Sequence, residues 1–270
     1  MPYHKYLDKK IFYKVSGEGP CIVLIHGFTE SLNIWNHFAK VLSKEFRVVT
    51  IDLPGHGQSE TISTVHTMDL LAEILHEILA MLKVESCLMV GHSMGGYIAL
   101  AYGRKYEYQL SGLVLFHSHC FADSEQDMKN RDRTIRVVEQ DKFSFMAQFI
   151  PALFPEESRE KFKSEIVELI ADSESMTREG TIAALAGMKI RQDHSEFLKL
   201  TKLKVLFILG LVDSKAPVDR FWEMISLPEY AEVLLLKNVG HMGYIEAKEG
   251  TLLAIHHFGL KCLALNLRIR

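Results

Sequence analysis

The chain has 270 residues, 48% of them apolar, and its 31 Lys and Arg against 34 Asp and Glu leave a net charge of −3. Such a chain can bury a substantial core, which excludes a disordered protein, and its near-balanced charge excludes a general attraction to nucleic acid or anionic lipid. The polar N-terminus and the lack of a long apolar run predict no leader peptide, no membrane span and a cytoplasmic location.

In chain order, two polar alternating segments at residues 3–7 and 10–15 predict an antiparallel hairpin at a sheet edge. Six short apolar runs follow, and such runs are typical of buried strands in a parallel sheet covered on both faces. Apolar residues at helical spacing between them supply crossover helices, so the alternation predicts a doubly wound α/β fold. The runs lie at residues 21–27, 46–53, 86–92, 110–118, 203–210 and 231–238.

Residues 120–200 interrupt this alternation, because no strand-like run occurs there. Apolar periodicity predicts helices instead, with Pro151 and Pro155 as breaks. We therefore expect a core of residues 1–119 and 201–270 and an all-helical insertion of residues 120–200. The expected helices lie at 125–140, 142–150, 156–172 and 178–191.

The octet VGHSMGGY sets Ser93 between Gly91 and Gly95, at the junction of a predicted strand and a predicted helix. Glycine suits a turn too tight for a Cβ, since it reaches dihedrals that cost other residues energy. A turn at this junction would expose the hydroxyl at the carboxyl edge of the sheet, where open α/β sheets bind ligands. Ser93 is therefore the candidate nucleophile.

A serine nucleophile needs a histidine base and an acid that orients the base. His241 follows the apolar run at 231–238, and Asp213 follows the run at 203–210. Both are thus expected at the sheet edge that carries Ser93, in the chain order serine, aspartate, histidine. Asp123 lies beyond the run at 110–118 and is the rival acid.

Five motifs, taken together, resemble those of the α/β-hydrolase superfamily, in particular its lidded serine esterases. The resemblance implies the α/β-hydrolase fold, a cap formed by residues 120–200, and an oxyanion hole made by the backbone N–H groups of Phe28 and Met94. Met94 also opens a predicted helix, whose free N–H groups favour developing negative charge. The motifs are HGF at 26–28, DLPGHGQS at 52–59, GHSMGG at 91–96, GLVD at 210–213 and GHMGYIE around His241.

Candidate pocket residues follow from positions near the nucleophile, at a strand end or in the insertion. The insertion supplies many apolar side chains, and Tyr97 stands where some anion-handling relatives carry arginine, so an apolar pocket and a neutral substrate are expected. His26 and His92 are expected to brace loops, and His117 either to line the pocket or to pack. The candidates are Tyr97, His119, Phe143, Met146, Phe149 and Met188.

The sequence therefore predicts a serine hydrolase of the carboxylesterase type, EC 3.1.1, which cleaves a small to medium, mostly apolar ester through an acyl-enzyme. Its expected partner is a small-molecule substrate. The four cysteines are widely spaced and form no ligand cluster, so neither a metal nor a cofactor is expected. Three alternatives stay open: a carbon-carbon bond hydrolase, a cofactor-free perhydrolase, and a non-catalytic ligand-binding receptor on this fold.

Overall fold

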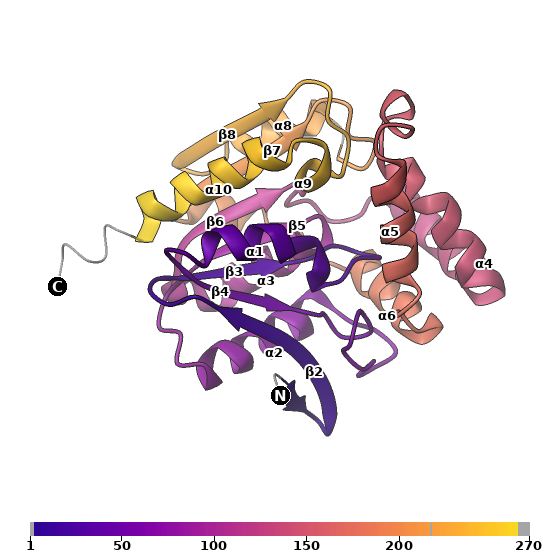
Figure 1. The fold of residues 1–270 in the computed structure, drawn as a ribbon, viewed down its shortest axis with the longest axis horizontal. Coiled ribbons are helices and arrows are strands. Elements are labelled where there is room, and N and C mark those ends of the chain that lie inside the picture. The colour runs from indigo at the N-terminus through magenta and orange to yellow at the C-terminus, as the bar shows by residue number, and fades with distance from the viewer. Residues whose placement is uncertain (1–2, 217, 264–270) are drawn as a thin grey trace.

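A computed structural model describes residues 3–216 and 218–263 (Figure 1). These residues form one eight-stranded sheet in the order β1-β2-β4-β3-β5-β6-β7-β8. β1 and β2 form the expected edge hairpin, β2 pairs antiparallel with β4, and the remaining pairs are parallel, which confirms the mostly parallel sheet. The strands are β1 Tyr3–Tyr6, β2 Lys9–Ser16, β3 Cys21–Ile25, β4 Arg47–Ile51, β5 Cys87–His92, β6 Leu110–Phe116, β7 Lys204–Gly210 and β8 Tyr230–Leu236.

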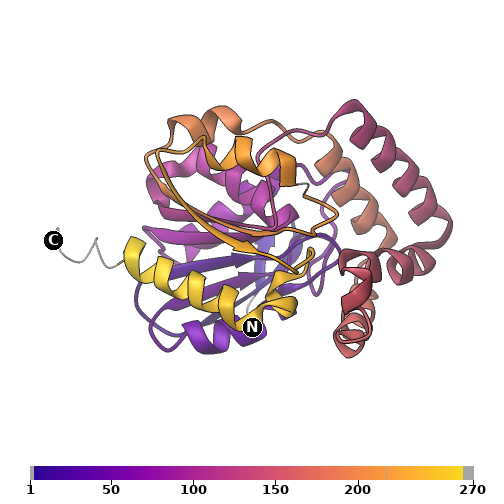
Figure 2. The same cartoon turned by 90° about the horizontal axis from the view of Figure 1, so that it is seen from above.

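Helices cover both faces of the sheet, as expected for strands with continuous apolar runs. α1 and α10 lie over one face, and α2, α3 and α8 lie over the other (Figures 1 and 2). In α2, the buried Leu71, Leu75 and Ile78 recur at helical spacing. The bounds are α1 Asn36–Leu42, α2 Met68–Met81, α3 Met94–Tyr106, α8 Val218–Ile225, α9 Gly243–Glu246 and α10 Lys248–Leu263.

β8 departs from the sequence prediction of a buried strand. It pairs only with β7 and forms the sheet edge opposite β1. Val233 is 44% exposed and Leu235 is 39% exposed, whereas β3 and β5 are buried at every position. Continuous apolarity alone could not separate this edge strand from the central ones.

Four helices lie between β6 and β7: α4 Glu125–Phe149, α5 Lys163–Ser173, α6 Arg178–Lys189 and α7 Ser195–Leu200. We call α4, α5 and α6 the inserted helices, and in both views they stand beyond the carboxyl ends of the strands (Figures 1 and 2). α4 is interrupted at Asp141, where φ is −153° and ψ is 90°, between the two helices expected there. α5 begins later than expected, because Phe162 is not helical.

None of the helices in the described part of the chain combines the length and the apolarity needed to cross a membrane.

Candidate active site

Ser93 occupies a sharp turn between β5 and α3, with φ 50° and ψ −116°. A positive φ is costly for a residue with a Cβ and is found at functional turns. Gly91 and Gly95 do not share it, since the glycines with positive φ lie elsewhere in the described chain. They are needed for space: a Cβ on Gly91 would lie 2.3 Å from a backbone oxygen, and one on Gly95 2.4 Å. The strain therefore resides in the serine, and the glycines allow the chain to approach it closely.

Ser93, His241 and Asp213 form a continuous chain of hydrogen bonds at the carboxyl edge of the sheet. His241 Nε2 lies 2.8 Å from Ser93 Oγ, and His241 Nδ1 lies 2.9 Å from Asp213 Oδ2. Because the carboxylate faces Nδ1, that nitrogen carries the proton and Nε2 accepts the hydroxyl proton of Ser93. These contacts fix both the orientation of the His241 ring and the tautomer that a general base requires.

Asp213 is held ionised by its surroundings. Burial raises the pKa of its carboxyl, but His241 and His117 outweigh that effect and keep the pKa below its usual range. The backbone N–H groups of Lys215 and Ala216 also donate to Oδ1, at 2.7 Å and 3.2 Å. A permanently charged acid beside His241 can stabilise an imidazolium that forms there.

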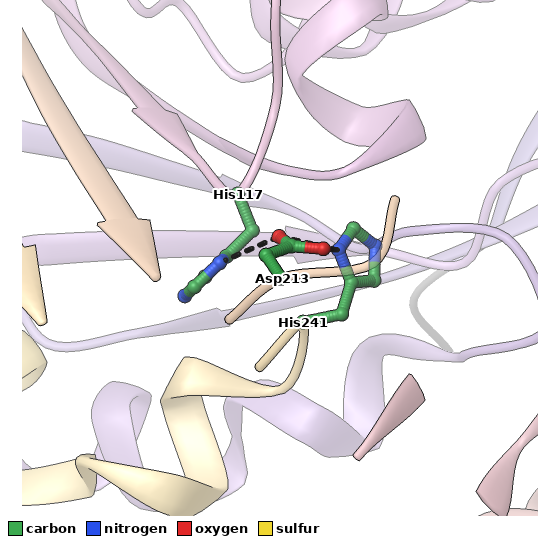
Figure 3. A group of neighbouring side chains, drawn as sticks. All are labelled: His117, Asp213 and His241. Carbon is green, nitrogen blue, oxygen red and sulfur yellow. Dashed lines mark hydrogen bonds and ion pairs between the residues drawn. The ribbon is translucent and has the colours of Figure 1, made fainter. Parts of the chain in front are cut away.

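His117 is a site residue whose role sequence reasoning missed. Its Nδ1–H donates to Asp213 Oδ2 at 3.0 Å, so the carboxylate lies between two histidines (Figure 3). Burial lowers the pKa of His117 to about 4, so its imidazole is neutral near pH 7. The signal was its place at the end of β6, beside β7, which ends close to Asp213.

The same three side chains also resemble a metal-ligand set. His117, Asp213 and His241 place one donor atom each within 4.8 Å of one another. A metal requires its histidine nitrogens to be free of protons. Here both Nδ1 atoms face a carboxylate, and two N–H···O hydrogen bonds account for the arrangement.

The backbone N–H groups of Phe28 and Met94 lie in the loop after β3 and at the start of α3. Among the described residues, neither group donates to a backbone or side-chain acceptor outside the regular elements. His26 braces the loop of Phe28, because its Nε2 accepts the Leu53 N–H at 3.0 Å and its Nδ1 contacts the Gly27 carbonyl at 2.8 Å. Both N–H groups are therefore candidates for an oxyanion hole.

A buried ion pair between His92 and Glu30 contacts the loop of Phe28 and the loop of His241. His92 Nδ1 is 3.0 Å from Glu30 Oε2, and His92 Nε2 is 2.9 Å from the carbonyl oxygen of His241. Both ring nitrogens face acceptors, so both carry protons and His92 is an imidazolium. Glu30 also accepts from the Gly27 N–H and from the Tyr244 hydroxyl. The pair therefore connects the loop of Phe28 to the loop of His241.

The two pKa values agree with this assignment. Burial lowers the pKa of His92, but the charge and hydrogen bond of Glu30 outweigh it and raise the pKa above its ordinary value. Burial raises the pKa of Glu30, but the charge and the hydrogen bond of His92 outweigh burial and lower this pKa below its ordinary value. Sequence reasoning expected His92 to brace a loop but did not identify Glu30 as its partner.

Replacing Glu30 by glutamine is expected to lower the free energy of unfolding by about 4 kcal/mol, because it leaves the His92 charge buried without a partner. Glu249→Gln is the matched control, since its carboxylate is 79% exposed and lies 3.3 Å from the half-exposed His37. That change should stay within about 0.5 kcal/mol. Urea unfolding at pH 7 measures both, and equally small effects would show that the buried pair is not charged.

Asp123, the rival acid, lies elsewhere in the site. Its side chain is buried and forms ion pairs with Arg131, at 2.7 Å, and with Arg191. It makes no hydrogen bond with His241, whose Nδ1 is occupied by Asp213. The structure therefore brings Asp213, and not Asp123, to the histidine.

Ser93 and His241 open into a cavity of about 440 Å³ between the strand ends and the inserted helices. Four of the six predicted pocket residues line it: Tyr97, His119, Phe149 and Met188. Phe143 and Met146 do not. Phe143 follows the break in α4 at Asp141 and is 56% exposed, and Met146 is buried in the hydrophobic core instead.

The wall of this cavity is more polar than the sequence predicted. Phe28, Leu153 and Phe221 supply apolar surface, but Arg131, Arg220 and other charged side chains line it as well. The expected apolar surface is present, but charged side chains share the wall with it. The expectation of an apolar pocket rested on the apolar side chains of the insertion, on Tyr97 and on the net charge, whereas the charged side chains of the wall come from α4, α8 and the segments after α6 and β7.

Comparisons with known proteins give consistent results. A family model described as alpha/beta hydrolase fold matches residues 20–248. A solved thermophilic esterase from Thermogutta terrifontis, with malate bound, is 29% identical, covers 94% of both chains and has a TM-score of 0.90. A 2-hydroxy-6-oxononadienedioate/2-hydroxy-6-oxononatrienedioate hydrolase of Paraburkholderia phymatum is 28% identical over 267 residues, 90% of this chain and 88% of that one.

A further relative is the dihydrolipoyllysine-residue acetyltransferase component of the acetoin cleaving system of Pseudomonas putida. It is 28% identical over 257 residues, which are 88% of this chain. The match covers 63% of that protein, so the chain spans less than two thirds of its length.

Proposed function

This chain belongs to the alpha/beta hydrolase family, and on that premise we propose that it is a serine hydrolase that cleaves carboxylic esters, with Ser93 as its nucleophile. One observation carries the proposal: the hydrogen-bonded chain from Ser93 through His241 to Asp213. The similarity to a solved esterase supports the choice of ester substrates. A cavity of about 440 Å³ suits a substrate of small to medium size.

In the proposed reaction, His241 Nε2 takes the hydroxyl proton as Ser93 Oγ attacks the ester carbonyl. The N–H groups of Phe28 and Met94 stabilise the oxyanion, and Asp213 stabilises the imidazolium. His241 then gives its proton to the departing alcohol, which leaves an acyl group on Ser93. Water, activated by the same histidine, releases the acid and restores the serine.

We further propose that the inserted helices act as a cap over this chemistry. Phe149 at the end of α4 packs edge-on against Phe28, with ring centroids 5.8 Å apart. The loop that would supply one oxyanion donor is thus in direct contact with the insertion. Such a cover would limit the access of water to the acyl-enzyme.

Carbon-carbon bond hydrolysis is the second candidate. It is favoured by the relative from Paraburkholderia phymatum, whose name specifies an oxo-dienedioate substrate. The same serine, base and oxyanion donors would serve that reaction, so the site geometry does not separate the two.

A substrate comparison tests the choice. We expect at least one p-nitrophenyl ester, in a series from acetate to octanoate, to exceed a 2-hydroxy-6-oxodienedioate in kcat/KM by about tenfold or more. Nitrophenolate release measures the first reaction, and loss of the dienoate absorbance measures the second. Faster cleavage of the dienoate than of every ester would overturn the ester assignment in favour of the second candidate.

A further inference from the structure

The cavity next to Ser93 carries an excess of positive charge. Three carboxylates also line it, but Glu30 is balanced by His92, which leaves Asp123 and Asp127 to oppose four cations. Two positive charges are thus in excess within the described wall. The cations come from four separate segments of the chain: Arg131, Arg191, Lys215 and Arg220.

Two of the four cations are committed to Asp123. Arg131 Nε donates to one oxygen of this buried carboxylate, and Arg191 Nη1 donates to the other. Arg191 also donates to the carbonyl oxygens of Phe121 and Met188, so its guanidinium is held in place. Arg220 and Lys215 form no ion pair with any residue that the structure describes, and they carry the excess charge.

Aromatic rings hold the arginines against the cavity wall. The Arg191 guanidinium lies 4.2 Å from the ring centroid of Tyr97, and that of Arg220 lies 3.9 Å from Phe121. His119 contacts both rings. Its Nε2 is hydrogen-bonded to the Tyr97 hydroxyl at 3.1 Å, and its imidazole stacks on the ring of Phe121. Stacking leaves the edges of a guanidinium available, and those edges match a carboxylate.

Lys215 reaches the cavity from the segment after β7. Its backbone N–H binds the carboxylate of Asp213, and its ammonium lies 5.1 Å from the ring centroid of Phe149. This ring also contacts Phe28, beside the proposed oxyanion hole. The backbone of Lys215 is thus held two residues from the proposed acid, and its ammonium forms no ion pair within the part of the chain that the structure describes.

His119 is a neutral neighbour of Arg191 and Arg220. Burial, followed by the charges of Arg191 and Arg220, lowers the pKa of its imidazole to about 3. Its Nδ1 is buried and has no partner among the described residues. The neutral ring thus adds no charge of its own, and it leaves a polar atom unused in the same part of the wall.

We propose that Arg220 and Lys215 form a subsite for an anionic group, so that the preferred ester carries a carboxylate away from its scissile bond. This inference rests on the proposed function. It reverses the sequence-based expectation of a neutral substrate. That expectation rested in part on Tyr97, which carries no positive charge, but the guanidinium of Arg191 lies against the Tyr97 ring.

Two matched pairs of esters test the subsite. Mono-p-nitrophenyl adipate and p-nitrophenyl 6-methylheptanoate have the same acyl length and end in a carboxylate or an isopropyl group. 4-Acetoxybenzoate and its methyl ester place the charge on the alcohol side instead. In at least one pair, kcat/KM should favour the anionic ester by about tenfold to hundredfold.

Variants assign that preference to its residues. Arg220→Gln and Lys215→Gln should each reduce the ratio of anionic to neutral kcat/KM by about tenfold. Lys261→Gln, which removes an equal charge from α10 outside the cavity wall, should leave the ratio unchanged. Because the subsite is open to solvent, added salt should also reduce the ratio in the wild type.

The outcomes separate this inference from the proposed function. A protein that cleaves both members of each pair, but favours the neutral one or keeps its ratio in Arg220→Gln and Lys215→Gln, overturns the anionic subsite alone. A protein that cleaves no ester and does not react with a fluorophosphonate at Ser93 overturns the proposed function, and the subsite with it.

Discussion

Ser93→Ala is expected to lower ester turnover by about a million-fold, because it removes the hydroxyl that would carry the acyl group. Within the described structure the side chain makes one hydrogen bond, to His241, and alanine keeps its Cβ, so the fold should be retained. The measurement is kcat for p-nitrophenyl acetate, with circular dichroism as the check on folding. Ser164→Ala is the matched control and should keep the wild-type rate, because Ser164 is an exposed serine of α5 whose hydroxyl donates to Glu165.

Wild-type rates in folded Ser93→Ala protein would remove Ser93 from the mechanism. Fluorophosphonate titration counts the reactive serines in the sample, and it therefore distinguishes activity of the variant from activity of a contaminating serine hydrolase.

Asp213→Asn is expected to lower kcat by about ten-thousand-fold. The amide can place an N–H against His241 Nδ1, which shifts the proton of the histidine to Nε2. A protonated Nε2 cannot accept the hydroxyl proton of Ser93, although it lies only 2.8 Å from Ser93 Oγ. The backbone N–H groups of Lys215 and Ala216 donate to the Oδ1 position and therefore favour the amide oxygen there. The NH₂ group then takes the Oδ2 position, which faces Nδ1 of both His241 and His117.

Asp123→Asn is the comparison for this prediction. It weakens ion pairs with Arg131 and Arg191, so its main effect should be on stability, with kcat for a neutral ester reduced by about tenfold at most. Saturation kinetics and thermal unfolding of the two variants measure the difference. If Asp123→Asn proves the more damaging to kcat, Asp123 is the acid.

The sheet could be predicted from the sequence because its strands are continuous apolar runs separated by helical periodicity. The edge hairpin, the break near Asp141 and the strand-turn-helix around Ser93 are all local patterns. Asp213 and His241 could be placed at the same edge as Ser93 because parallel strands share a carboxyl end. These predictions needed no knowledge of side-chain contacts.

The parts that could not be predicted depend on contacts between distant residues. Glu30 and His92 are 62 positions apart, and His117 and Asp213 are 96 apart. Neither pair has a local pattern that links its members. In the same way, the apolarity of Phe143 could not reveal which side of α4 it occupies after the break at Asp141.

The cationic wall of the cavity shows the same limit. Net charge reports the whole chain, and a value of −3 concealed four cations that converge on one cavity. Arg191 and Arg220 reach it from segments far from Ser93, and their stacking on Tyr97 and Phe121 exists only in the folded chain.

The most direct test of a nucleophilic Ser93 is to label the native protein with a fluorophosphonate and to locate the adduct by mass spectrometry. The account predicts one adduct per chain, on the peptide that contains Ser93, with none in Ser93→Ala and slow labelling in Asp213→Asn. An adduct on another serine, or no adduct in a preparation that hydrolyses esters, would contradict it.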